Sequence, residues 1–239
     1  MIKEITSSQN NKIKYAASLK MAKYRKENKE FLAEGKKSLE LALEAGVVKE
    51  IFTTKKLPGI RDDIVQYLVD ESLLKKLSST QNPEGIVFVC FMQERRIKRF
   101  DKVVYLDHVS DPGNMGTIIR TALAFSYDAV FVSEGSCDIY NEKVIAASKG
   151  AIFRIPVLIN NLEKIKEGAY VIVSALSKDA KELSSAKVKK PFVLVLGNEA
   201  HGVSQESLDL ADEVVKIDIA NIDSLNVSVA AGIMMHYFK

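Results

Sequence analysis

Short apolar runs alternate with amphipathic stretches along the second half of the chain. Runs rich in Val, Ile and Leu predict buried strands at 103–109, 129–135, 155–160, 170–176, 191–197 and 213–219. Apolar positions at helical spacing predict helices at 117–125, 141–150 and 224–238. Fully apolar strands that alternate with helices are typical of a parallel sheet covered on both faces. The second half is therefore predicted to be a parallel-sheet α/β domain, with ligands bound beyond the carboxyl ends of the strands.

The first half contains shorter elements. Its pattern predicts a polar, basic helix at 11–27, a helix at 36–46, and helical stretches around 60–68 and 71–77. Strand-like runs occur at 31–35, 48–54 and 86–91. The charged segment 94–100 then interrupts the pattern. We therefore expect two domains, a small α/β unit at 1–98 and the parallel-sheet domain at 99–239.

Composition places the chain among globular proteins. Of its 239 residues, 27% are charged and 47% hydrophobic, and no apolar run approaches the roughly 18 residues of a membrane span. The N-terminus lacks the apolar stretch of a secretion signal, so a cytoplasmic protein without a membrane partner is expected. Two cysteines cannot build a disulfide framework, and the three histidines show no ligand spacing, so no metal site is expected.

The net charge of +3 conceals an asymmetry between the two halves. Residues 1–100 carry a net charge of +7, and residues 101–239 carry one of −4. Within 12–29, seven Lys and Arg side chains are accompanied only by Glu27. Many basic clusters of this kind bind phosphate backbones, whereas others are solvated helix faces. Charge alone therefore suggests a first half that binds nucleic acid and does not decide between these alternatives.

Three loops at predicted strand ends combine glycine, asparagine and charge. In the first, at 106–122, Gly113 and Gly116 allow close backbone approach to a ligand, and the following helix offers free N–H donors. Asn114 can donate and accept hydrogen bonds, and Arg120 can point back at the loop. The pattern is neither the G-x-G-x-x-G fingerprint nor a P-loop, which argues against a nucleotide-binding oxidoreductase. A tight turn with a surface arginine is the alternative.

The second and third loops lie at 193–204 and 217–232. In the second, Glu199 follows a buried strand, where a carboxylate needs a partner; an acid that caps a helix is the alternative. In the third, Ser224 can cap the predicted last helix, and Asn226 is a polar residue in its first turn. Each loop alone also fits an ordinary turn or cap. Three such loops at one edge of a sheet predict a single pocket.

In order along the chain, the loops resemble the three motifs of the SpoU/TrmH family of RNA ribose methyltransferases, within the SPOUT superfamily. They read DPGNMGTIIRTA with Asn114 and Arg120, LGNEAHGVS with Glu199, and SLNVSVAAG with Ser224 and Asn226. The first half is similar to the substrate-binding domain of this family, a ribosomal-protein-like RNA-binding fold. That similarity rests on ITSSQNNKIK, on FLAEGKKSLELALEAG and on SSTQNPEGI at 78–86.

The resemblance implies a C-terminal trefoil knot, a homodimer and S-adenosyl-L-methionine as cofactor, none of which the residue pattern itself indicates. It implies cofactor contacts from Leu196, Gly197, Asn198, Gly202, Ile217, Ile219, Leu225 and Asn226. It implies catalytic roles for Asn114, Arg120, Glu199, Ser224 and Asn226, and it favours RNA binding by Lys12, Lys14, Lys23, Arg25 and Lys26. The segment before SLN departs from the family pattern, because it is shorter and has Asp218 where proline is common.

The implied reaction is methyl transfer to a ribose 2′-hydroxyl, which requires in-line alignment and removal of a proton. Arg120 would either pass its own proton transiently to a substrate phosphate or stay charged and stabilise the developing alkoxide. Asn114 and Asn226 would position Arg120 and the ribose. Glu199 would orient Arg120 or the pocket around it, and Ser224 would position the substrate or cap the last helix. Ribosomal RNA is the favoured substrate; a transfer-RNA methyltransferase of the same fold and a non-catalytic RNA-binding protein are the alternatives.

Overall fold

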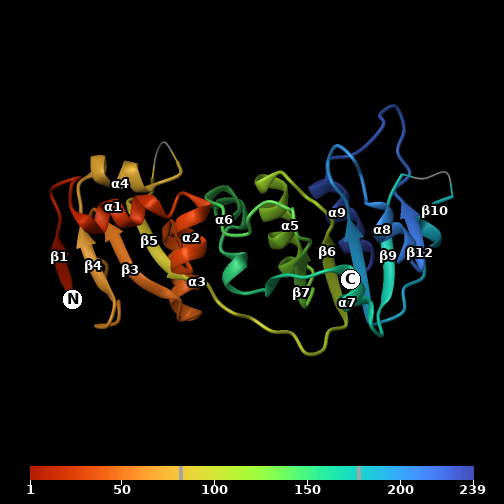
Figure 1. The fold of residues 1–239 in the computed structure, drawn as a ribbon, viewed down its shortest axis with the longest axis horizontal. Helices are drawn as coiled ribbons and strands as arrows, with labels where there is room; N and C mark the ends of the chain where they lie inside the picture. The colour runs from red at the N-terminus through yellow and green to blue at the C-terminus, as the bar shows by residue number, and fades with distance from the viewer. Residues whose placement is uncertain (81–82, 177–178) are drawn as a thin grey trace. The chain divides into compact units, whose positions relative to one another are not determined.

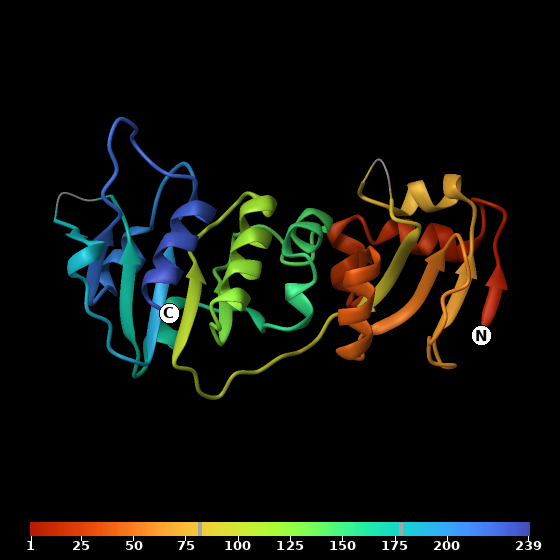
Figure 2. The ribbon, with the colours of Figure 1, turned by 180° about the vertical axis from the view of Figure 1, so that it is seen from behind.

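The chain folds into two compact units, each with its own sheet (Figures 1 and 2). The first unit comprises Met1–Glu94 and Tyr140–Phe153, and the second comprises Arg95–Ile139 and Arg154–Lys239. The segment 140–153, which lies within the second domain of the sequence prediction, therefore groups with the first unit.

The computed structural model describes residues 1–80, 83–176 and 179–239. Residues 81–82 of the motif-like segment 78–86 thus lie outside the described residues. None of the helices in the described ranges is long and apolar enough to cross a membrane.

The first unit contains a five-stranded sheet in the order β1-β4-β3-β5-β2, in which β5 runs antiparallel to both of its neighbours. The strands are β1 (Ile2–Glu4), β2 (Glu30–Glu34), β3 (Val48–Thr53), β4 (Val65–Leu68) and β5 (Ile86–Phe91). The helices are α1 (Asn11–Ser18), α2 (Ala22–Asn28), α3 (Lys36–Glu44), α4 (Glu71–Leu77) and α6 (Glu142–Ser148). Apolar side chains of α1 and α4 share one core cluster with residues of β2, β3 and β5.

Two sequence predictions for this unit are wrong. The basic helix predicted at 11–27 is broken into α1 and α2. The stretch around 60–68, predicted to be helical, contains β4, because Val65–Leu68 pairs with β1 on one side and with β3 on the other. Gln66 is buried within this strand, where its amide bonds to the backbone N–H and C=O of Leu57 at 2.9 and 3.2 Å. Strand pairing therefore overrides the local helical spacing.

The second unit contains a seven-stranded sheet in the order β10-β12-β9-β11-β6-β7-β8, and every neighbouring pair is parallel. The strands are β6 (Lys102–Leu106), β7 (Ala129–Val132), β8 (Val157–Ile159), β9 (Tyr170–Ser174), β10 (Lys181–Glu182), β11 (Phe192–Leu196) and β12 (Glu213–Lys216). The helices are α5 (Pro112–Ala124), α7 (Leu162–Lys166), α8 (Gln205–Asp209) and α9 (Val227–Tyr237). Every residue of β6, β7 and β11 is buried, which accounts for their apolar composition. The predicted parallel sheet is confirmed.

Two helices of this unit begin at other residues than the sequence predicted. Helix α5 begins five residues early, at Pro112, because Asp111 caps it by accepting the Asn114 N–H at 2.7 Å and proline needs no N–H partner at this position. Helix α9 begins at Val227. Its cap is Asn226 and not Ser224, so the predicted Ser224 cap is wrong. Helices α5 and α9 pack against each other (Figure 2).

Candidate active site

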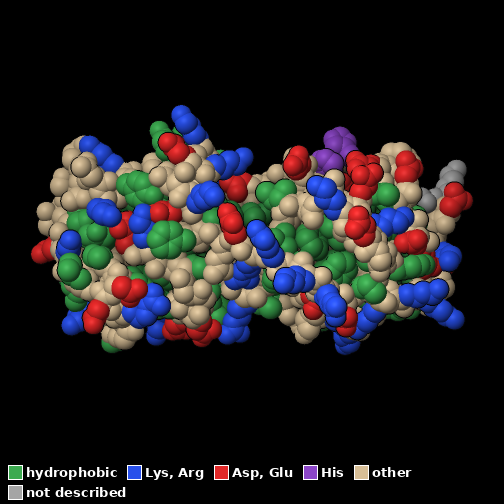
Figure 3. Space-filling view, turned by 60° about the horizontal axis from the view of Figure 1, so that its bottom comes forward, with side chains coloured by type: hydrophobic (Ala, Val, Ile, Leu, Met, Phe, Trp, Pro, Cys, Tyr) green, Lys and Arg blue, Asp and Glu red, His purple; other side chains and the backbone are tan. Residues whose placement is uncertain are grey.

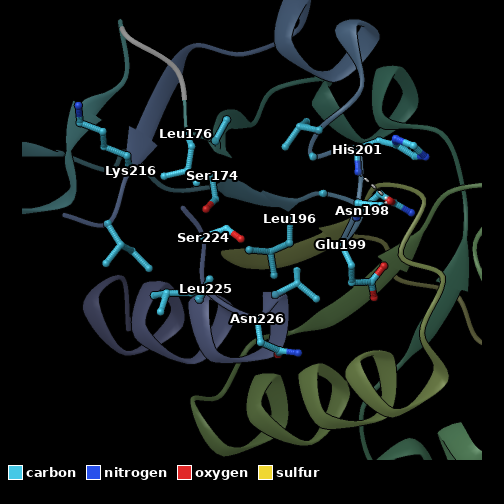
Figure 4. A pocket seen from close by; sticks show the side chains of 18 of the residues that line it. Ser174, Leu176, Leu196, Asn198, Glu199, His201, Lys216, Ser224, Leu225 and Asn226 are labelled. Atoms are coloured by element: carbon cyan, nitrogen blue, oxygen red, sulfur yellow. Dashed lines mark hydrogen bonds between the residues drawn. The ribbon is translucent and has the colours of Figure 1, made fainter. Parts of the chain in front are cut away.

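The carboxyl ends of β6, β11, β9 and β12 meet at one edge of the second sheet, because all of these strands are parallel neighbours. A cavity of about 600 Å³ opens at this edge. Its walls come from the ends of β9, β11 and β12, from the loops that follow them, and from the start of α9 (Figure 4). This volume is in the range of small-molecule sites.

A tight turn after β11 forms one wall of the cavity. The backbones of Asn198 and Gly202 exchange two hydrogen bonds of 2.8 and 3.0 Å. The Asn198 side chain accepts the N–H groups of Ala200 and His201 at 2.8 and 3.0 Å. A Cβ at Gly197 would lie 2.4 Å from the carbonyl carbon of Gly202, so only glycine fits there. The close approach at Gly197 is thus made by the chain's own backbone.

Glu199, within this turn, connects it to the loop that precedes α5. Its carboxylate accepts hydrogen bonds from the Ser110 N–H and hydroxyl at 3.2 and 3.0 Å, from the Asp111 N–H at 3.2 Å and from the Asn114 amide at 3.0 Å. Partial burial favours the neutral acid, but the hydrogen bonds, led by that of Asn114, outweigh it and lower the pKa of Glu199. Glu199 is therefore a fixed anion that organises this loop.

The third loop joins the same network through the cap of α9. The Asn226 amide donates to Asn114 Oδ1 at 3.0 Å, and its own Oδ1 accepts the Ser228 N–H at 2.9 Å. A continuous path of hydrogen bonds therefore runs from Asn226 through Asn114 to Glu199. Figure 4 shows Asn226 and Glu199 on the side of the cavity that faces α5. Each of the three loops found in the sequence contributes one member of this path.

The structure gathers most of the predicted site residues around the cavity. The lining includes all eight predicted cofactor contacts, namely Leu196, Gly197, Asn198, Gly202, Ile217, Ile219, Leu225 and Asn226. Among the predicted catalytic residues, Glu199, Ser224 and Asn226 also line it, whereas Asn114 is joined to it through its hydrogen bonds to Glu199 and Asn226. These placements leave the chemical role of each residue a prediction.

Arg120 is not among the residues that line the cavity. The sequence placed it one turn into its helix, but α5 begins at Pro112, so Arg120 lies in the third turn. Its side chain is exposed, and within the described parts of the chain it has no hydrogen bond or ion pair. Glu199 bonds to Asn114 and not to Arg120, so its geometry supports the predicted role of organising the pocket.

Sequence reasoning missed the wall that follows β9. Ser174, Ala175 and Leu176 line the cavity there, and Lys216 does so at the end of β12. The available signal was topological, because any strand that neighbours β11 in a parallel sheet delivers its carboxyl end to the same edge. The apolar run at 170–176 was recognised as a strand, but its position beside β11 cannot be read from the sequence.

The five basic residues predicted to bind RNA differ in their surroundings. Lys14, Lys23 and Lys26 are exposed, whereas Lys12 bonds to the buried Glu50 at 2.7 Å. Arg25 is only 3% exposed, and its guanidinium donates to the carbonyls of residues 19 and 20 at 3.0 and 2.7 Å. Arg25 therefore stabilises the end of α1 and is not available to a phosphate. On the face drawn in Figure 3, basic and acidic side chains of the first unit are interspersed.

The cavity lining suits a ligand with a flat apolar part and a polar part. Leu196, Ile217, Ile219 and Leu225 provide apolar contact. The hydroxyl groups of Ser174 and Ser224 and the backbone groups of the loops offer hydrogen bonds. Figure 4 shows Ser174, Leu196 and Ser224 around the same space. Nucleosides combine a flat ring with a polar sugar, so this donor set fits a nucleoside cofactor.

Comparison with known proteins gives one consistent relationship. Residues 101–236 match the model of the SpoU rRNA Methylase family, and residues 10–87 match the MRM3-like substrate binding domain. Over the full length of both chains, the protein is 34% identical to a Bacillus subtilis protein named 23S rRNA (guanosine(2553)-2'-O)-methyltransferase RlmP. The crystal structure of an AdoMet-bound rRNA methyltransferase from Sinorhizobium meliloti superposes with a TM-score of 0.89 at 28% identity, covering 99% of this chain and 97% of that one.

Proposed function

The chain belongs to the SpoU rRNA methylase family, and from this premise we propose that it transfers a methyl group from S-adenosyl-L-methionine to a ribose 2′-hydroxyl of ribosomal RNA. The observation that carries the proposal is the hydrogen-bonded path Asn226–Asn114–Glu199, because it joins all three family motifs at the wall of one cavity. A substrate in ribosomal RNA is supported by the name of the B. subtilis relative.

The cavity would hold the cofactor through the apolar side chains of Leu196, Ile217, Ile219 and Leu225 and through backbone groups of the turn at 197–202. When bound, S-adenosyl-L-methionine supplies a methyl group that its sulfonium charge has already activated. The chain must align the ribose oxygen with that group, and such positioning contributes several kcal/mol, of the order of 5, to catalysis. Asn114 and Asn226 are suited to this task because their amides are already held in place by the network.

We assign Arg120 the role of stabilising the negative charge that forms on the ribose oxygen during the reaction. A guanidinium stays protonated in proteins, and the Arg120 side chain is exposed. We therefore favour the alternative in which Arg120 stays charged, holds an RNA phosphate and stabilises the developing alkoxide. Ser224 is free to contact the substrate, since Asn226 caps α9 in its place.

The two family matches support separate functions for the two domains. Residues 1–98 are assigned to RNA recognition and residues 99–239 to methyl transfer, which the two model matches support. The exposed Lys14, Lys23 and Lys26 are the best candidates for phosphate contacts. The Lys12 side chain bonds to Glu50 but is partly exposed, so it can also contact a phosphate. We assign the protein to the cytoplasm, where ribosomal RNA is modified. We also assign a trefoil knot to the part of the chain around the cavity.

A homodimer is proposed on the outer face of α9. Val229, Ile233 and Tyr237 follow one another at intervals of four residues and are 50%, 40% and 45% exposed. Exposed apolar stripes on a helix typically mark an interface. Ile233→Asp should therefore shift the protein from dimer to monomer in sedimentation velocity. A monomeric wild type would contradict this assignment.

The function is tested with the Arg120→Ala variant. We expect methyl transfer to ribosomal RNA to fall at least about 100-fold, as for other residues that stabilise developing charge, while calorimetry shows unchanged binding of S-adenosyl-L-methionine. Arg154→Ala serves as a control for the loss of one arginine from the second unit. Wild-type protein that binds the cofactor but methylates transfer RNA alone would favour the alternative substrate. Normal transfer by Arg120→Ala would refute the role of Arg120.

A further inference from the structure

The edge of the sheet that holds the cavity is strongly acidic. The loops that follow β6, β7, β9, β11 and β12 contain eight acidic residues, namely Asp107, Asp111, Glu134, Asp138, Asp179, Glu199, Asp218 and Asp223. No lysine or arginine occurs among the described residues of these loops; Lys178 lies outside the described ranges. Lys216, the last residue of β12, lines the cavity at this edge. An RNA strand brings one negative charge with each phosphate, so further groups at this edge that can bind a phosphate would favour its binding.

His108 lies at this edge, directly after β6, and is fixed at three points. Its N–H donates to the Ser133 hydroxyl at 2.8 Å, its carbonyl accepts the Asn198 amide at 2.7 Å, and its ring Nδ1 lies 2.7 Å from Asp107 Oδ1. The Asp107 side chain is 2% exposed, and its second oxygen accepts the Ser204 N–H at 2.7 Å. The His108 side chain is nevertheless 53% exposed. A buried carboxylate therefore orients an imidazole whose other nitrogen, Nε2, is available to a ligand.

The backbone at His108 is also unusual. Its φ angle of 57° lies in the left-handed region, where residues with a side chain are uncommon. The ring of His108 lies beside Gly135, whose φ of 88° is itself in the left-handed region. Glycine or asparagine would satisfy this backbone better than histidine does. The left-handed turn therefore tolerates histidine but does not by itself require it.

His201 is anchored to the same side chain as His108. Asn198 accepts the His201 N–H at 3.0 Å while it donates to the His108 carbonyl. His201 is exposed and lies at the wall of the cavity (Figure 4). Figure 3 shows histidine side chains together in one place, with acidic and basic side chains near them. Asn198 thus ties two exposed histidines to the mouth of the cavity.

We propose that His108 and His201 form a contact for a phosphate of the RNA strand beside the methylated nucleotide. The proposal rests on the proposed function and adds to it a strand-binding element that is independent of Arg120 and of the basic residues of the first unit. Asp107 positions His108 and balances its charge. The acidic surroundings repel other phosphates, so this contact would favour one register of the strand over its neighbours.

The groups that face the two histidines make the contact sensitive to pH. Asp107 is desolvated, but hydrogen bonds from Ser204, His108 and Ser207 lower its pKa, and the pKa of Glu199 is also lowered. Burial raises the pKa of the Cys137 thiol to about 11. The two carboxylates therefore stay charged and the thiol stays neutral between about pH 6 and 8. RNA affinity should strengthen as the pH is lowered across this range.

The test compares His108→Asn, His201→Asn and the double variant with wild-type protein. Asparagine tolerates the left-handed backbone of residue 108, and His108→Gly is a second variant if the first does not fold. His236→Asn is the matched control, because His236 is an exposed histidine of the same unit on α9. The measurements are the KM and kcat for methylation of ribosomal RNA transcribed in vitro, and the Kd for that RNA at pH 6 and pH 8.

We expect each single variant to raise the KM roughly 3- to 10-fold at pH 6 with kcat nearly unchanged, as for loss of one phosphate contact. The double variant should lose the pH dependence of RNA affinity. The binding of S-adenosyl-L-methionine should not change in His108→Asn, because His108 is not among the residues that line the cavity. A KM and a pH profile that match His236→Asn would overturn the proposal and leave His108 a structural residue. If wild-type protein binds RNA without methylating it, the proposed function is overturned. The effect of the histidine variants on RNA affinity would then still show whether the histidines contact the RNA.

Discussion

Replacing Glu199 with glutamine tests whether one carboxylate organises the active site. The side chains have the same shape, so the change removes charge and acceptor capacity without creating a cavity. The native carboxylate accepts four hydrogen bonds, two at each oxygen. A glutamine that turns its carbonyl toward Asp111 and Asn114 keeps two of these bonds. Its amide then faces the Ser110 N–H, and that bond is lost because two donors oppose each other.

The size of the effect follows from this count. Hydrogen bonds to charged groups contribute about 1.5–3 kcal/mol and neutral ones about 0.5–1.5 kcal/mol. Glu199 is exposed on one side, so the lower ends of these ranges apply. One lost bond and the loss of charge at the others give a decrease in unfolding free energy of about 1–2 kcal/mol. In a chain of this length, that decrease lowers Tm by about 2–8 °C.

The assay is chemical or thermal unfolding of Glu199→Gln at several pH values, with Glu206→Gln as control. Glu206 lies in the first turn of α8, and within the described residues its side chain has no hydrogen bond. Because the folded pKa of Glu199 is lowered, its charged form adds stability that is fully present above its usual pKa of 4.5. That contribution is lost as the pH falls through the lowered pKa. The difference between wild type and Glu199→Gln should therefore be constant from pH 5 to 8 and shrink below 4.5.

The same variant should lose methyl transfer more than cofactor affinity, because Glu199 holds Asn114 while much of the cavity wall is apolar. The reasoning is refuted if Glu199→Gln matches Glu206→Gln in both unfolding free energy and kcat. A stability difference that persists unchanged to pH 3 would show that shape, and not charge, holds the loop.

Other predictions follow from single contacts. Gly197→Ala should abolish calorimetric binding of S-adenosyl-L-methionine, since its Cβ would meet the opposite strand of the turn at 2.4 Å; Gly232→Ala in α9, where nothing lies within 4 Å, should bind normally. Asn226→Ala should lower the unfolding free energy by about 1–2 kcal/mol through loss of the cap of α9. Asn226→Asp keeps that cap but cannot donate to Asn114, so it should lower kcat with little loss of stability, as single-turnover kinetics would show. Arg25→Met should lower the unfolding free energy by about 1–3 kcal/mol, measured as a lower urea midpoint, without weakening RNA binding. A loss of RNA affinity without a loss of stability would contradict its structural role.

The parallel sheet could be predicted from the sequence because its central strands β6, β7 and β11 are buried along their whole length. The first unit was harder, because its short strands carry polar residues that their partners satisfy. Gln66 in β4 shows this, since the backbone of Leu57 uses both ends of its amide. The start of α5 could have been predicted from the dipeptide Asp111–Pro112, which is a capping residue followed by a first-turn proline. That local signal was outweighed by the apolar spacing that begins later.

The candidate site was predicted as residue types and not as a set of contacts. Glycine and asparagine loops at the ends of apolar strands identified the edge, and the family motifs identified the residues. Which side chains bond depends on β11 lying beside β6, which brings Glu199 to Asn114 across 85 positions of sequence. Burial is equally invisible in sequence, so Arg25 looked like its neighbour Lys26, although it is buried and its guanidinium bonds to the backbone at the end of α1.

The positive charges available for RNA are spread over several sites. Arg120 is exposed on α5 and does not line the cavity, the basic helices lie in the first unit, and the loops at the mouth of the cavity carry acids and two histidines. An RNA that touches only one of these sites meets weak attraction or repulsion. An RNA that engages more than one of these sites binds more tightly, because each further contact forms within a complex that already exists. We therefore expect short single-stranded fragments around the methylated nucleotide to be poorer substrates than longer RNA, as the KM for methylation of fragments of increasing length would show.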